Sequence, residues 1–142
     1  MKKILFIVCV LAVNFNLFSQ DKTAKINFLT TEIDYGIIEK GSNGVRDFIF
    51  TNDGNSPLII TNVKSTCGCT IPKKPEKPIL PGETDKIQVK YDTKRVGFIR
   101  KSISVTSNAS NPNVILKITG QVIADNNKTG LEKKKKSIVE DY

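Results

Sequence analysis

The sequence predicts an all-β fold, and three observations support this. From Lys25 onward, short apolar runs alternate with turn residues, and no apolar run keeps a helical period for three turns. Clusters of Gly, Asn, Asp and Pro separate these runs at regular intervals. The 142 residues, 39% of them hydrophobic and 25% charged, fit one soluble domain with one core. Together these observations predict an immunoglobulin-like β-sandwich of about seven or eight strands.

The first twenty residues have the order of a secretory signal peptide. Lys2 and Lys3 precede the apolar run Ile4–Val13, and Phe18-Ser19-Gln20 closes the segment. A membrane span needs about 20 apolar residues, and this run is shorter, so we expect cleavage near Ser19, with an uncleaved anchor as the alternative. We therefore expect export to the periplasm, the cell surface or the extracellular space, where disulfides persist.

The first half of the domain contains four expected strands. They cover Ile26 to Phe28, Ile33 to Ile38 with an interruption at Gly36, Val45 to Asn52, and Leu58 to Val63. Turns are expected at 41–44 and 52–57. Within the third strand, Phe48 and Phe50 share one face and Ile49 lies on the other, as expected for a strand inside a sandwich.

The second half begins with a proline-rich segment. Pro72, Pro75, Pro78 and Pro81 occur within ten residues, and proline donates no amide to a sheet. We expect a loop or sheet edge here that carries the chain from one sheet to the other.

Three further strands are expected after the prolines. The range 84–91 alternates most clearly, with Ile87, Val89 and Tyr91 on the buried side. Strands over 99–105 and 114–122 follow, separated by a turn at 108–113. The predicted organisation is a signal peptide at 1–20, a β-sandwich at 21–124 and a polar lysine-rich tail at 125–142. We expect the tail to be mobile, with weak contact to anionic surfaces through Lys133, Lys134, Lys135 and Lys136.

Several short motifs together resemble a known family. They are Phe48 to Gly54 with Pro57-Leu58, Cys67-Gly68-Cys69-Thr70, Pro78 to Gly82, Val89 to Thr93, Gly97-Phe98, Ser107-Asn108-Ala109 and Leu116 to Gly120. This set is similar to the bacterial exported domains of unknown function numbered 1573, which are immunoglobulin-like and akin to Hydin-type domains. The family commonly has Ser directly before the first cysteine, where this chain has Thr66. The resemblance implies an exported β-sandwich and no established activity, and by analogy a scaffolding or docking module.

Cys67 and Cys69 are the only cysteines after the leader. In an extended strand, residues two apart keep their Cβ atoms about 6.6 Å apart, whereas a disulfide needs roughly 3.5 to 4.5 Å. Gly68 can bring the sulfurs together by taking a positive φ. The pair then has four interpretations: a constrained local disulfide or packed thiol pair, a redox site, a copper(I) site, or a bond to another protein.

The composition excludes several classes of activity. The chain contains no histidine, which excludes Ser-His and Cys-His catalysis and closed zinc sites within a monomer. Scattered acids such as Asp34, Asp85 and Asp92 are expected in turns and on solvated strand faces. We predict no enzyme activity, no cofactor, no resident metal and no nucleic-acid partner. The expected function is an exported module that binds an envelope protein or polymer through the Cys67–Pro81 loop or a free sheet edge. The alternative is a small thiol-redox or copper(I)-binding protein that uses Cys67 and Cys69.

Overall fold

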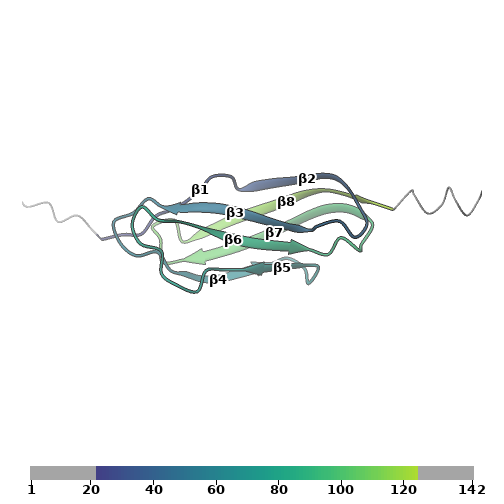
Figure 1. The fold of residues 1–142 in the computed structure, drawn as a ribbon. Helices are drawn as coiled ribbons and strands as arrows, with labels where there is room; N and C mark the ends of the chain where they lie inside the picture. Colours follow the sequence, from purple (N-terminus) through teal and green to yellow (C-terminus); the bar gives the residue numbers. More distant parts are fainter. Residues whose placement is uncertain (1–21, 125–142) are drawn as a thin grey trace, which may run out of the picture.

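A computed structural model describes residues 22–124, so the predictions for residues 1–20 and for the lysine-rich tail lie outside the described residues. Eight strands form two four-stranded sheets that face each other (Figure 1). One sheet has the order β1 (Ile26–Phe28), β3 (Val45–Asn52), β6 (Thr84–Tyr91) and β5 (Thr70–Lys73). The other has the order β2 (Glu32–Glu39), β8 (Asn113–Ile123), β7 (Gly97–Ser107) and β4 (Ile60–Ser65). The predicted β-sandwich is confirmed.

Between the sheets lies a core built by alternation along the strands. Phe48 and Phe50 of β3 are buried while Ile49 between them is half-buried, and Ile87, Val89 and Tyr91 of β6 are buried as predicted. The facing sheet contributes Ile99, Ile103, Val105, Leu116, Ile118 and Val122. Period-two burial on both inner faces is the reason why these segments form strands. Within residues 22–124, no helix is long and apolar enough to cross a membrane.

The strand expected over Leu58 to Val63 starts two residues later than expected, because β4 begins at Ile60. Leu58 pairs with Ile79 through two backbone hydrogen bonds of 2.8 Å, and the ladder to β7 begins only at Ile60. Within the apolar run Leu58–Ile60, Leu58 therefore pairs with Ile79 whereas Ile60 begins the pairing with β7. The apolar pattern of this run does not show at which residue the pairing with Ile79 stops and the pairing with β7 starts.

The proline-rich segment lies where predicted but does not cross between the sheets. Pro72 lies in β5, an edge strand, which tolerates a missing amide donor. However, β5 and β6 are neighbours in one sheet, so the segment that joins them stays on that sheet. The predicted crossing at the prolines is wrong. The chain crosses earlier, between β4 and β5, because those two strands lie at the edges of different sheets.

Candidate functional site: the disulfide turn and the edge beside it

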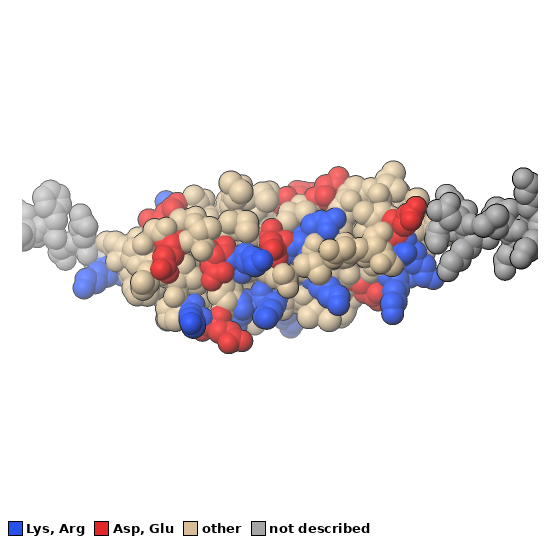
Figure 2. Space-filling model, viewed as in Figure 1, with Lys and Arg blue, Asp and Glu red and all other residues tan. Residues whose placement is uncertain are grey.

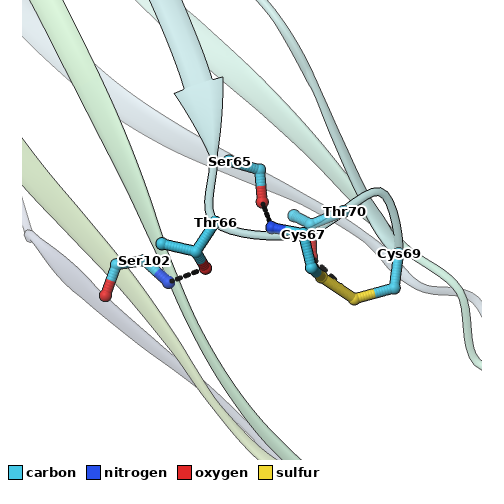
Figure 3. The surroundings of a disulfide bond; sticks show 6 residues. All are labelled: Ser65, Thr66, Cys67, Cys69, Thr70 and Ser102. Carbon is cyan, nitrogen blue, oxygen red and sulfur yellow. Dashed lines mark hydrogen bonds between the residues drawn. A yellow bond between two sulfur atoms is a disulfide. The ribbon is translucent and has the colours of Figure 1, made fainter.

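The crossing is made by the four residues Thr66 to Cys69, which we call the disulfide turn. Cys67 and Cys69 are joined by a disulfide (Figure 3), with their Cα atoms 5.4 Å apart. That separation is shorter than the roughly 6.6 Å of an extended strand. The turn is closed by a 3.4 Å hydrogen bond from the Thr70 amide to the Cys67 carbonyl. The chain therefore reverses within the ring of the disulfide.

Gly68 does not take the conformation expected of it. Positive φ angles occur at Gly36, Gly41, Gly82, Gly97 and Gly120, and Gly68 is not among them. A Cβ atom added at Gly68 would meet nothing within 4 Å. The expectation of a left-handed glycine is wrong, because a tight turn with ordinary backbone already brings the two cysteines close enough to bond.

Hydrogen bonds attach the disulfide turn to both sheets. The Thr66 amide donates to the Ser102 carbonyl at 3.1 Å, and the Ser102 amide donates to Thr66 Oγ1 at 3.4 Å (Figure 3). On the other side, the Asp92 amide, directly after β6, donates to the Cys69 carbonyl at 2.9 Å. The turn thus extends the β4–β7 pairing and meets the end of β6. No feature of the sequence marks Ser102 as its partner.

The two cysteines differ in exposure. Cys69 is buried in the core together with Thr70, whose hydroxyl lies 3.9 Å from each sulfur, whereas Cys67 is half-buried. A reactant in solvent therefore approaches the bond from the Cys67 side. In the disulfide form neither sulfur is a thiolate, the form that binds copper(I). Among residues 22–124, no three carboxylate or thiol side chains gather as a metal site would require.

The acids noted in the sequence lie apart and bind local backbone. Asp34 accepts a 2.8 Å bond from the Gly36 amide, Asp85 a 2.7 Å bond from the Lys86 amide, and Asp92 a 3.1 Å bond from the Lys94 amide. All three side chains are on exposed residues. Such local bonds are typical of turns and strand ends, and these acids form no common site.

Beside the disulfide turn, β5 and the proline-rich segment form an exposed edge. Ile71 of β5 is 65% exposed, and a groove next to it is lined by Lys73, Lys74, Pro75, Glu76, Lys77, Asp85, Lys86 and Gln88. The Lys74 ammonium donates a 3.1 Å hydrogen bond to the Ile60 carbonyl of β4. Positive and negative side chains are interspersed on the face seen in Figure 2. This edge is therefore mixed in charge, with apolar side chains between the charges.

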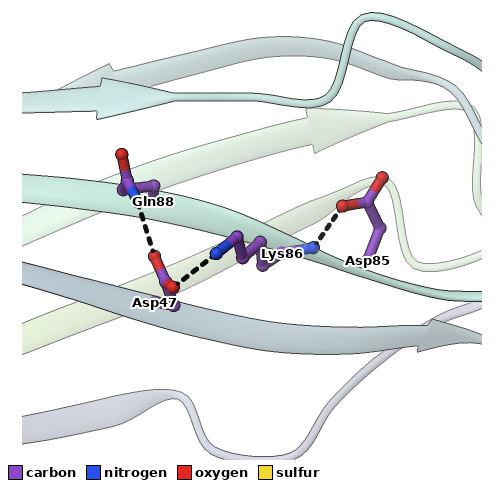
Figure 4. A network of polar contacts seen from close by, with 4 residues as sticks. All are labelled: Asp47, Asp85, Lys86 and Gln88. Atoms are coloured by element: carbon purple, nitrogen blue, oxygen red, sulfur yellow. Dashed lines mark hydrogen bonds and ion pairs between the residues drawn. The ribbon is translucent and has the colours of Figure 1, made fainter.

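Lys86 and Gln88, which line that groove, belong to a polar network centred on Asp47 of β3 (Figure 4). Lys86 donates to one carboxylate oxygen at 2.7 Å, and Gln88 donates to the other at 3.1 Å. The hydrogen bond from Lys86 lowers the pKa of Asp47, with a further contribution from Gln88, while partial burial opposes the shift. Asp47 is therefore ionised and neutralises Lys86. The other lysines that line the groove, Lys73, Lys74 and Lys77, make no ion pair within the described residues.

Comparison with known proteins gives a family and a fold. A family model described as "Protein of unknown function (DUF1573)" matches residues 26–122. No curated protein matches the chain. A protein of unknown function from Porphyromonas gingivalis W83 is similar in structure, with a TM-score of 0.63 and 19% identity over 76% of this chain and 51% of that one. This chain therefore spans about half the length of that protein.

Two further structures share the fold. The human CEP192 PapD-like domain 7 has a TM-score of 0.61 and 10% identity, over 78% of this chain and 93% of that domain. The VesB protease of Vibrio cholerae has a TM-score of 0.53 and 12% identity, over 70% of this chain but only 31% of the protease. Likeness at these identities is evidence of an immunoglobulin-like, PapD-like fold and of nothing about activity.

Proposed function

Because the chain belongs to the DUF1573 family of proteins of unknown function, we propose that it is a non-catalytic, exported interaction module of the bacterial cell envelope. Its contact surface is the β4–β5 side, which we define as the disulfide turn, β5 and the proline-rich segment 74–81. The expected partner is an envelope protein or polymer. Export is supported by the leader-like sequence of residues 1–20 and by a disulfide in the mature domain.

One observation carries this proposal: the disulfide turn joins the edge strands of the two sheets. Because β4 ends and β5 begins at the same turn, the β4 edge of one sheet and the β5 edge of the other lie on the same side of the sandwich, opposite the β1 and β2 edges. The turn is bonded to β7 through Ser102 and to the end of β6 through Asp92, so the corner is held in place. A rigid corner with exposed apolar and cationic groups suits docking, because little conformational entropy is lost on binding.

Side-chain contact fits this edge better than addition of a partner strand. β5 has only four residues, one of them Pro72, which donates no amide. In β4, the Ile60 carbonyl already accepts a hydrogen bond from Lys74, and the ladder to β7 is irregular between Ile60 and Asn62. Such features discourage strand pairing at an edge. The exposed Ile71 side chain and the neighbouring Lys73 are then the expected contacts.

Substitution of Ile71 tests the proposal directly. Ile71→Glu places a charge on the expected contact and leaves the core untouched, because Ile71 faces solvent. Leu29→Glu is the matched control, since Leu29 is also exposed but adjoins β3 on the opposite side of the sheet. Envelope proteins and polymers captured by the full chain are quantified by mass spectrometry and sugar analysis. Loss of captured partners with Ile71→Glu and retention with Leu29→Glu is expected, and equal capture by both variants would contradict the proposal.

The half-buried disulfide supports thiol exchange as a second candidate function. An incoming thiolate attacks the sulfur of Cys67, the more exposed residue, and forms a mixed disulfide while Cys69 leaves as a thiolate. A second thiol then releases the oxidised product and leaves both cysteines reduced. Alkylation and mass spectrometry in glutathione buffers of graded potential measure this. If Cys67 and Cys69 stay oxidised across the range of glutathione buffers, the chain is not a thiol-exchange protein.

A further inference from the structure

Loops and strand ends gather at the end of the sandwich where β8 ends at Ile123. The Lys40 amide donates to the Ile123 carbonyl at 2.8 Å, and the Gly41 amide donates to the Thr93 carbonyl at 3.1 Å. These bonds bring the turn after β2, the turn after β6 and the last residue of β8 together. We call this the basic end, because it carries the exposed cations Lys40, Lys94 and Arg95. Figure 2 shows basic side chains gathered there.

Three large apolar side chains are exposed next to these cations. Ile37 of β2 and Phe98 of β7 both pair with Gln121 of β8, so they stand in one row across the outer face of the sheet. Ile37 is 72% exposed and Phe98 69% exposed, and Val96, two residues before Phe98, is 55% exposed. Exposed apolar side chains that cluster beside charges are typical of an interaction surface.

The local backbone leaves this apolar row without cover. A β-bulge between Asp34 and Ile37 places Gly36 against Gly120, and a Cβ atom at Gly120 would lie 2.9 Å from the Gly36 carbonyl oxygen. The two glycines line a shallow groove together with Ile37 and Phe98. No described side chain fills the groove, and the Arg100 guanidinium stands 5.7 Å from the centre of the Phe98 ring.

We propose that the basic end, with Ile37, Val96 and Phe98, docks on an anionic lipid surface. Apolar tips that enter the boundary between headgroups and acyl chains, with cations around them, are the chemistry of peripheral membrane contact. Nucleic acid would use the cations but not the aliphatic side chains. The acids of this end are Glu39, Asp34 and Asp92, and the last two bind backbone amides. The described residues carry 15 Lys and Arg against 9 Asp and Glu, a net charge of +6.

The sequence that follows β8 contains further cations. β8 ends at Ile123, beside Lys40, and the four lysines at 133–136 follow within the next 13 residues. A basic residue near an anionic bilayer contributes about 1 kcal/mol. The folded end and the lysine run therefore favour the same partner, and the folded end supplies the apolar contact and hence the orientation.

Vesicle flotation of the full chain tests the cationic part. The vesicles are phosphatidylglycerol mixed with phosphatidylcholine, compared with phosphatidylcholine alone. Lys94→Gln with Arg95→Gln is expected to weaken binding to the anionic vesicles about 30-fold, the equivalent of about 2 kcal/mol. The charge-matched control is Lys22→Gln with Lys25→Gln, since both exposed lysines lie at the opposite end, where the Lys25 carbonyl accepts from the Asp53 amide and the Thr23 carbonyl from the Asn55 amide. Equal weakening by both pairs would show a net-charge effect only and overturn the proposal.

A site-specific crosslink tests whether the exposed apolar side chains of the basic end contact lipid. Because it reports contact at one labelled position, membrane binding through residues 1–20 would not produce the expected difference between positions. Benzoylphenylalanine at Val96 is expected to crosslink to lipid under light, whereas the same group at Leu80 is not. Leu80 is a matched control, because it is 52% exposed and lies at the other end, near Asn52. Absence of a lipid adduct at Val96, or equal adducts at both positions, would overturn the proposal, as would binding that depends only on the lysines at 133–136. Thermal melts confirm that each variant is folded.

Discussion

The hydroxyl group of Tyr35 donates a 2.8 Å hydrogen bond to the carbonyl oxygen of Gly44, and this bond connects the two sheets. Tyr35 belongs to β2, while Gly44 directly precedes β3 and its carbonyl also accepts the Tyr91 amide at 2.9 Å. The Tyr35 ring meets the Tyr91 ring edge to face, and the Arg46 guanidinium lies 4.4 Å from its centre. One side chain thus joins strands that share no backbone hydrogen bond.

Tyr35→Phe is expected to lower the free energy of unfolding by about 1 kcal/mol, the usual value of one buried hydrogen bond. The loss is modest because the Gly44 carbonyl keeps its bond to the Tyr91 amide. Urea unfolding at pH 7 measures it. An unchanged midpoint would mean that the Tyr35 hydroxyl contributes nothing to the contact between the sheets.

The same residue predicts an alkaline instability. Burial raises the pKa of Tyr35, opposed by the Arg46 charge and reinforced by Tyr91. A pKa above the unfolded value of 10.0 means that the contribution of Tyr35 is complete below pH 10 and is lost as the pH rises through the folded pKa. Unfolding from pH 8 to 11.5 is expected to show a steeper alkaline loss in the parent than in Tyr35→Phe. Parallel curves for the two proteins would contradict this assignment.

Asn52 is the most connected buried side chain of the domain. Its Nδ2 donates to the carbonyls of Ser56 at 2.8 Å and Ile79 at 3.0 Å, and its Oδ1 accepts from the amides of Gly54 at 3.0 Å and Lys25 at 3.3 Å. Asn52→Asp keeps the shape but turns the donor into an acceptor that faces two carbonyls. We expect a loss of about 3 kcal/mol or more, since unpaired buried polar groups cost about 1–3 kcal/mol each. Thermal and urea unfolding measure it, with exposed Asn55→Asp as the control.

Gly44 and Gly68 differ in their tolerance of alanine. A Cβ atom at Gly44 would collide with the Tyr91 carbonyl oxygen and approach Thr93 Cγ2 to 2.9 Å, whereas at Gly68 it would meet open space. Gly44→Ala is therefore expected to destabilise the domain by several kcal/mol, because backbone must move. Gly68→Ala is expected to be neutral within about 0.5 kcal/mol and to keep the disulfide. Thermal melts and free-thiol assays of the two variants measure this. A large loss of stability, or loss of the disulfide, in Gly68→Ala would contradict the described turn.

The disulfide is expected to contribute little to stability. Loop entropy gives about 1.6 kcal/mol for a ring that spans three residues. Cys67→Ala with Cys69→Ala is thus expected to fold and to lose less than about 2 kcal/mol, loss of packing at buried Cys69 included. Denaturant unfolding of the double variant and of the reduced parent measures this. Failure of the double variant to fold would assign the bond a structural role that its ring size does not explain.

Asp47 predicts a small acid-side effect. Its hydrogen bond from Lys86 lowers its pKa below the usual 3.8, so the stability that it contributes is present above pH 3.8 and is lost as the pH falls through the folded pKa. Both partners are partly solvated, so Asp47→Asn is expected to cost less than about 1 kcal/mol at pH 7. Thermal melts are recorded from pH 7 to 2, and the midpoints of the parent and of Asp47→Asn are expected to converge at the acid end. Asp53→Asn is the control.

Local pattern was sufficient to predict most of the strands. The alternation of Ile87, Val89 and Tyr91 with Lys86, Gln88 and Lys90 predicted β6 at both ends, and Phe48 and Phe50 placed the inner face of β3. Such predictions succeed because successive side chains of a strand point to opposite faces, so a strand between core and solvent alternates in polarity. The absence of histidine likewise needed no coordinates to exclude imidazole chemistry.

Pairings between distant segments could not be predicted in this way. The step from one sheet to the other at Thr66–Cys69, the bond from Thr66 to Ser102, and the row of Ile37 and Phe98 across Gln121 each depend on which strands become neighbours. Prolines mark where pairing stops but not which sheet the chain joins next, and a glycine between two cysteines does not specify its own φ. These features follow from the packing of two sheets around one core, which residues far apart in the chain determine jointly.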